Sequence, residues 1–122
     1  MKAGRISQIA LAVKDLDASV TFYQEILELP LIFKAEPGMA FFDCHGIRLM
    51  LSQANEVPAG GPILYFSVDA IDTAYREIGE KGASCLREPL MTHQSEGSEL
   101  WLAFFSDPDG HMLALMETRV LQ

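Results

Sequence analysis

The sequence contains no long hydrophobic run. No stretch approaches the roughly 18 apolar residues that a membrane-spanning helix needs, so we expect no membrane partner. The N-terminal segment is interrupted early, because Lys14 and Asp15 follow its first apolar residues and break the core that a secretory signal requires. We therefore expect a cytoplasmic protein.

Basic residues and cysteines are both scarce. The chain has 9 Lys and Arg against 17 Asp and Glu, a formal net charge of −8. Nucleic acids and anionic membranes need basic patches, so neither is expected as a partner, whereas an acidic surface favours a cationic small molecule. The only cysteines, Cys44 and Cys85, lie in expected strands. Without a secretion signal, we expect two buried free thiols rather than a disulfide.

The residues that are present fit one globular domain, residues 1–122. A hydrophobic fraction of 49% and a charged fraction of 21% exclude a disordered chain. A chain of this length buries roughly two-thirds of its unfolded surface, which is enough for a real core.

The domain contains an internal repeat. Residues 13–18 (VKDLDA) correspond to residues 68–73 (VDAIDT), and residues 46–51 (GIRLML) correspond to residues 110–115 (GHMLAL). The repeat predicts two modules, at about residues 5–53 and 63–117, joined by a Pro- and Gly-containing linker at 54–62.

Each module has the pattern strand, helix and three strands, so we expect an α+β fold of two βαβββ modules. In the first, Asp15 is positioned to cap the helix and Pro30 to end it. In the second, Asp69 is the expected cap, and the polar residues 92–98 are an expected inserted loop. The expected strands are 8–13, 31–35, 39–44, 47–53, 63–68, 84–88, 99–106 and 111–117.

Each expected sheet has an apolar face for its helix and a mixed opposite face. A sheet with one bare face must bury it, so we expect the two modules to pair into an open, barrel-like cup. The mixed faces supply most of the candidate ligand-binding residues: Gln8, Arg48, Met50, Ile63, Tyr65, Ser67, Met112 and Ala114. Arg48 would be costly inside a cup unless it meets a ligand anion or a protein acid.

The strand at 99–106 adds two aromatic candidates. Alternate residues face opposite ways, so either Trp101 and Phe105 or Leu100, Leu102 and Phe104 look into the cup. We favour Trp101 and Phe105 as ligand-binding residues. No residue is assigned a catalytic role.

The two ends of the repeat carry a family resemblance. The pattern Ile9-Ala10-Leu11-x-Val13-x-Asp15-Leu16 with Phe22-Tyr23, and the later Asp107-Pro108-Asp109-Gly110-His111, resemble the opening and the closing hairpin of the glyoxalase, bleomycin-resistance and extradiol-dioxygenase superfamily, also called vicinal oxygen chelate. The resemblance covers residues 5–117. It implies a cup in which metal-using members place two ligands per module, usually His or Glu, on the first and last strands.

The four corresponding positions here are Gln8, Met50, Ile63 and Ala114. None is His, Glu, Asp or Cys, so we expect no metal ion and no cofactor. The three histidines, His45, His93 and His111, are scattered and are expected in turns or the inserted loop. Recruitment of a metal by one of them remains the alternative.

The resemblance favours a metal-independent small-molecule binding protein, as in the bleomycin-resistance branch. The alternative is a glyoxalase-, lyase- or dioxygenase-like enzyme with an atypical metal site or none, and a third reading is a regulatory or partner-binding module. Family members with two modules are commonly homodimers, which is the oligomeric state expected here.

Overall fold

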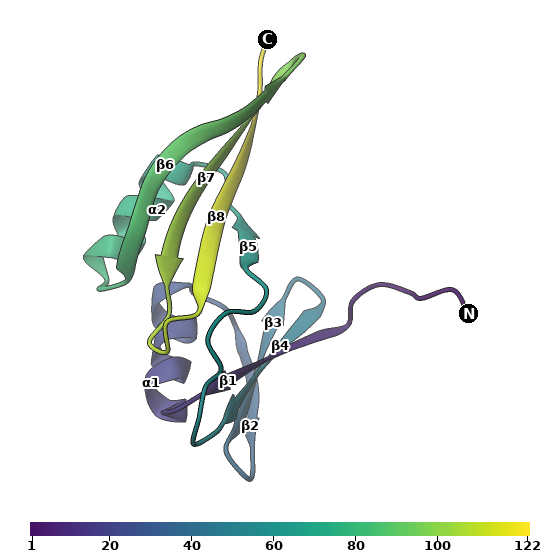
Figure 1. Cartoon of the computed structure of the whole chain (residues 1–122), viewed down its shortest axis with the longest axis vertical. Coiled ribbons are helices and arrows are strands. Elements are labelled where there is room, and N and C mark those ends of the chain that lie inside the picture. Colours follow the sequence, from purple (N-terminus) through teal and green to yellow (C-terminus); the bar gives the residue numbers. More distant parts are fainter. The chain divides into compact units, whose positions relative to one another are not determined.

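The computed structural model describes all 122 residues and divides the chain into two compact units (Figure 1). The first module is Met1–Pro58 and the second is Ala59–Gln122. Each has one four-stranded sheet and one helical segment, so the α+β fold of two βαβββ modules is confirmed. None of the helices has both the length and the apolar character that crossing a membrane requires.

The first module has its strands in the order β1-β4-β3-β2, with β1 parallel to β4 and the other pairs antiparallel. The parallel pair needs a crossover connection, which the helical segment supplies. The elements are β1 (Gln8–Val13), α1 (Leu16–Thr21), the π-helix η1 (Phe22–Ile26), β2 (Leu31–Ala35), β3 (Met39–Cys44) and β4 (Ile47–Gln53).

The second module repeats this plan, with the order β5-β8-β7-β6 and β5 parallel to β8. Its elements are β5 (Leu64–Ser67), α2 (Ile71–Glu80), β6 (Ser84–Ser95), β7 (Ser98–Ser106) and β8 (Met112–Val120). The matching order and direction of the strands show that the sequence repeat is a structural repeat.

The first helix begins as predicted and ends differently. The Asp15 side chain accepts a hydrogen bond from the Ala18 N–H at 3.1 Å and caps α1. The second half is the π-helix η1, followed by Glu28 in the left-handed region at φ 56°. The helical segment therefore ends before Pro30 is reached.

The second helix is capped by a different residue from the one predicted. Asp69 is not the cap: the N-cap residue is Ala70, which makes no side-chain hydrogen bond. The Ile71 N–H instead donates to Glu117 Oε1 of β8 at 2.8 Å. A residue far along the chain thus satisfies one of the unpaired N–H groups at the start of α2.

The expected loop at 92–98 is the end of a long hairpin. β6 continues to Ser95 and pairs antiparallel with β7, with His93 opposite Leu100 and Ser95 opposite Ser98. Gly97, at φ 83°, allows the tight turn between the strands. Residues 84–95 of this edge strand are almost all exposed. Neither face of the strand needs apolar residues there, so the sequence lacks the alternation of apolar and polar residues from which the full length of the strand could have been predicted.

One face of each sheet packs against the helix of its own module. In the first module, Tyr23 of η1 lies 6.1 Å from Phe42 of β3 between ring centroids, and Leu49 and Leu51 are buried on this face. In the second, Leu113 and Leu115 of β8 are buried. We call the opposite face of each sheet its open face.

The two cysteines are free thiols, as predicted, but Cys85 is exposed rather than buried. It lies on the edge strand β6, next to α2. A Cβ added at Gly79 of α2 would lie 3.5 Å from Cys85 Sγ. Burial, together with a hydrogen bond to Cys85, raises the pKa of Tyr75 to about 12. Cys44 is half-buried.

We predict that Glu117 stabilises the second module through its cap on α2. Glu117→Ala should lower the free energy of unfolding by about 1–2 kcal/mol, because it leaves the Ile71 N–H without its acceptor. Glu117→Gln should cost less, since an amide oxygen still accepts. Urea denaturation at pH 7 measures both. An Ala variant as stable as the wild type would contradict the cap.

The pH dependence of the same stability follows from the pKa of Glu117. The hydrogen bond from Ile71, helped by Arg119, lowers the pKa of this carboxyl below its usual range. The stabilisation by the charged form is therefore complete above the unfolded-state pKa and lost as pH falls through the folded-state pKa. We expect the stability difference between the wild type and Glu117→Gln to be constant above the unfolded-state pKa and to shrink as pH falls through the lowered folded-state pKa, which urea denaturation over an acidic pH series measures.

Candidate functional site

The open face of the first module brings together residues from all four of its strands. Gln8 pairs with Arg48 and Ala10 with Met50 between β1 and β4. Phe41 of β3 lies opposite Met50, and Phe33 of β2 lies opposite Phe41. Because residues paired across neighbouring strands share a face, this register places the side chains on one surface.

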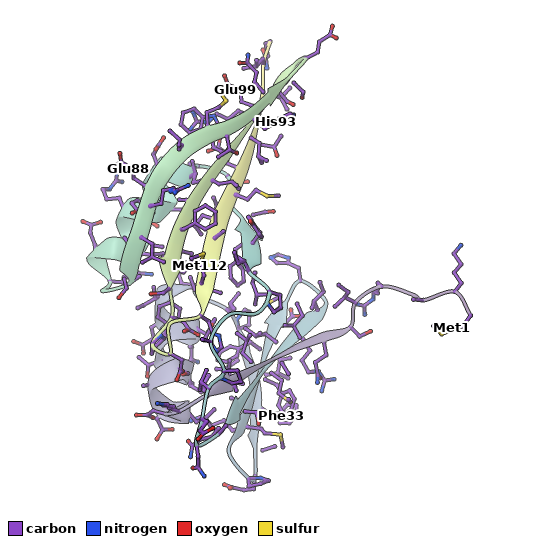
Figure 2. The ribbon with its side chains drawn as sticks, viewed as in Figure 1. Met1, Phe33, Glu88, His93, Glu99 and Met112 are labelled. Atoms are coloured by element: carbon purple, nitrogen blue, oxygen red, sulfur yellow. The ribbon has the colours of Figure 1, made fainter.

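The side chains of this surface contact one another. Phe33 and Phe41 are stacked, with ring centroids 4.5 Å apart and an angle of 23° between the ring planes. The guanidinium carbon of Arg48 lies 5.4 Å from the centroid of the Phe41 ring. Gln8 Nε2 donates a long hydrogen bond to Met50 Sδ at 3.9 Å. Figure 2 labels Phe33 beside β2.

The open face of the second module is built around Ala114. Tyr65 of β5 and Phe104 of β7 lie on either side of Ala114 in the sheet. Two strands separated by a third are about 9.5 Å apart, yet the two ring centroids are only 6.2 Å apart. The rings therefore lean toward each other across β8. Ala114 is fully buried at 0% exposure, and Tyr65, at 47% exposure, is available for contact.

Three other predicted site residues lie around this ring pair. Ser67 lies two residues beyond Tyr65 on β5 and is exposed, and Met112 lies two residues before Ala114 on β8 with 43% exposure (Figure 2). Ile63 directly precedes β5 and is half-buried. Arg87 of β6, unassigned from sequence, has its guanidinium carbon 5.9 Å from the centroid of the Phe104 ring.

The predicted orientation of Trp101 and Phe105 is wrong. Phe105 lies opposite Leu113 and Trp101 opposite Glu117, which caps α2, so both belong to the helix-packed face. Phe105 is fully buried there. Trp101 stacks under Arg119, whose guanidinium carbon lies 4.0 Å from the Trp101 ring centroid. Leu102 and Phe104 are the β7 residues on the open face.

The four positions that correspond, by the family resemblance, to metal ligands of metal-using members carry side chains here that do not fit a metal ion. The Gln8 amide nitrogen is turned to the Met50 thioether, a soft donor that suits Cu(I) rather than Zn²⁺. Ile63 has no donor atom. Ala114 has none either and lies between two aromatic neighbours. No group of three or more His, Cys, Asp or Glu side chains in the structure could hold a metal ion.

The three histidines lie on separate elements. His45 is exposed in the turn between β3 and β4, in the left-handed region at φ 52°. His93 is exposed on β6 rather than in a loop, and Figure 2 shows it near the far end of the hairpin. The backbone of His111 bonds to Asp107, which closes the turn before β8. None of the three histidines belongs to a group of three or more side chains that could hold a metal ion.

This chain resembles known proteins in both sequence and structure. A model of the family described as "Glyoxalase/Bleomycin resistance protein/Dioxygenase superfamily" matches residues 5–115. The solved structure of a glyoxalase-related enzyme from Fulvimarina pelagi superposes with a TM-score of 0.78 at 21% identity, covering 94% of this chain and 88% of the other.

Two curated relatives have similar sequences. "Metallothiol transferase FosB" of Bacillus licheniformis is 26% identical over 117 residues, which cover 90% of this chain and 73% of the relative. "Uncharacterized protein YraH" of Bacillus subtilis is 28% identical over 126 aligned positions, covering 91% of this chain and 96% of the relative.

We predict that Ala114 cannot accept a larger side chain. Ala114→Leu should lower the free energy of unfolding by about 1–3 kcal/mol, because the added atoms must separate the Tyr65 and Phe104 rings. Ala10→Leu is the matched control. Ala10 is exposed on the other open face, so this variant should stay within about 0.5 kcal/mol of the wild type. Chemical denaturation measures both, and equal stabilities would show that the ring pair does not close over Ala114.

Proposed function

Because the chain belongs to the glyoxalase, bleomycin-resistance and dioxygenase superfamily, we propose that it is a small-molecule binding protein that holds its ligand without a metal ion. The ligand lies on the open faces of the sheets. The observation that carries this proposal is the Tyr65–Phe104 ring pair over Ala114. This ring pair places apolar atoms at a position where, by the resemblance, metal-using members of the family have a side chain that donates to the metal ion.

The composition of the open faces supports ligand binding. Phe33, Tyr65 and Met112 each keep more than two-fifths of their surface exposed, at 43%, 47% and 43%. Ligand sites are mostly apolar and aromatic, with a few polar groups that orient the ligand. Gln8 and Ser67 lie on the same open faces and provide such groups.

An enzyme is the competing function, because three curated relatives are named metallothiol transferases and a fourth is named a glutathione transferase. A metal-dependent reaction at the family position would need a bound ion, and a Zn²⁺ site takes about three or four N, S or O donors. At the family positions, Gln8 and Met50 offer one amide oxygen and one thioether, and the side chains of Ile63 and Ala114 offer no donor. The donor set therefore favours binding over metal-dependent catalysis.

We further propose that the protein is a homodimer. This follows from what is common among family members with two modules. Trp101 and Phe105 are no longer part of the proposed ligand surface. Phe104 takes their place.

We predict that the untagged protein binds no divalent metal with one-to-one stoichiometry at Gln8 and Met50. Elemental analysis of the purified protein and calorimetric titration with Zn²⁺ and Ni²⁺ measure this. A stoichiometric ion that is lost in Gln8→Ala would overturn the proposal.

Histidine variants serve as the controls for this titration. An ion lost only in His45→Ala, His93→Ala or His111→Ala would leave the family position without metal and would favour an enzyme with an atypical site. Turnover of a glyoxalase or thiol-transfer substrate by protein without bound metal would show catalysis independent of the ion.

We predict a homodimer with twice the chain mass of 13.5 kDa. Size-exclusion chromatography with light scattering measures the mass directly. A single species at the mass of one chain, unchanged over a hundredfold range of protein concentration, would contradict the dimer.

A further inference from the structure

We propose that the ligand carries a carboxylate or another oxyanion, which Arg48 binds, on a flat apolar body that lies against Phe33. This inference rests on the proposed function and specifies the class of ligand. It places one charged contact and one apolar contact next to each other on the open face of the first module.

Arg48 is a cation without an anionic partner in the protein. Its side chain is exposed, and none of the ion pairs in the structure includes it. The acid directly opposite it in the sheet is Asp43 of β3. Asp43 Oδ1 accepts the Gly46 N–H at 2.9 Å and so serves the turn between β3 and β4.

The guanidinium of Arg48 lies over the ring of Phe41, with its carbon 5.4 Å from the ring centroid. A guanidinium that stacks on a ring keeps its N–H groups in its own plane, where they can donate two parallel hydrogen bonds to an oxyanion. Phe41 is itself fixed, since it is 8% exposed and stacked against Phe33. The contact with a fixed Phe41 therefore favours one position of the donor group before a ligand arrives.

The same contacts argue against a cationic ligand, although the net charge of the chain is −8. Cations bind well to the faces of aromatic rings. On the two open faces, Arg48 lies over Phe41 and Arg87 over Phe104. The exposed rings Phe33 and Tyr65 are the direct neighbours of Phe41 and Phe104, so a cation bound to either would lie close to one of these guanidinium groups. Charges more than about 8–10 Å away are largely screened in physiological salt, so the distant surface acids count little here. The one acid opposite Arg48 is Asp43, whose carboxylate accepts the Gly46 N–H of the turn.

The apolar part of the ligand follows from the neighbour of Phe41. Phe33 is 43% exposed, and its ring is nearly parallel to that of Phe41, at 23°. Half-buried Met50 lies opposite Phe41 on the other side. A flat ring fits this surface, with its oxyanion directed at Arg48.

The experiment compares three probes of one shape and different charge: 2-naphthoate, 2-naphthamide and 2-naphthylmethylammonium. Dissociation constants are measured by amide chemical-shift titration of the full-length protein. We expect the naphthoate to bind at least tenfold more tightly than the other two. Stronger binding of the ammonium probe, or equal binding of all three, would overturn the anion proposal.

Two variants that each remove one positive charge complete the test. Arg48→Gln should weaken naphthoate binding at least tenfold and leave naphthamide binding unchanged. Lys34→Gln is the matched control, because Lys34 follows Phe33 on β2, faces the other side of the sheet and reaches Asp17 of α1 at 3.9 Å. It should leave both affinities unchanged.

The outcomes separate this inference from the proposed function. An equal loss of naphthoate and naphthamide binding in Arg48→Gln would make Arg48 a packing residue and overturn the anion contact. Binding of naphthamide without preference for naphthoate would also overturn it, while small-molecule binding would stand. Absence of binding by all three probes would count against both.

Discussion

The parallel pairing of the first and last strands of each module determines where every candidate residue lies. Parallel neighbours cannot be joined by a tight turn, so the chain crosses over through a helix that covers one face of the sheet. The pairing of Ala10 with Met50 and of Tyr65 with Ala114 then fixes which side chains share the other face. A shift of one residue in either pair would exchange the two faces.

The two modules fill equivalent positions of this framework with different side chains. In the first, a methionine at position 50 lies between the small Ala10 and Phe41; in the second, a small Ala114 lies between Tyr65 and Phe104. On the last strand of each module, the large Met50 pairs with the small Ala10 of the first strand, and the small Ala114 pairs with the large Tyr65. The packing consequence differs between the two: Ala114 is fully buried between its aromatic neighbours, so an overlap there costs stability, whereas Ala10 is exposed and leaves room for a larger side chain.

The sequence predicts much of the fold because the repeat, the turn residues and the period-two strands are local signals. It failed where the deciding contact is distant or the pattern is uninformative. Glu117 replaces Asp69 at the start of α2 through a pairing that only the folded sheet creates. Both alternating sets of β7 residues are apolar, so parity could not orient Trp101. A comparison of the two modules could have oriented β7. Phe41 lies beside Met50 and Phe104 beside Ala114, so the repeat itself assigns Phe104, and not Trp101, to the open face.

The obstacle to a metal ion at position 114 is more than the missing donor atom. Restoring a carboxylate or imidazole at position 114 would also require the Tyr65 and Phe104 rings to separate, because they meet across this residue. A donor group placed there would be buried among apolar atoms, where an unpaired charge is strongly disfavoured. A return to a metal site therefore needs at least a donor and a smaller neighbour together. Tyr65, which takes part in this aromatic contact, still keeps 47% of its surface exposed, so one side chain both closes over Ala114 and offers a surface to a ligand.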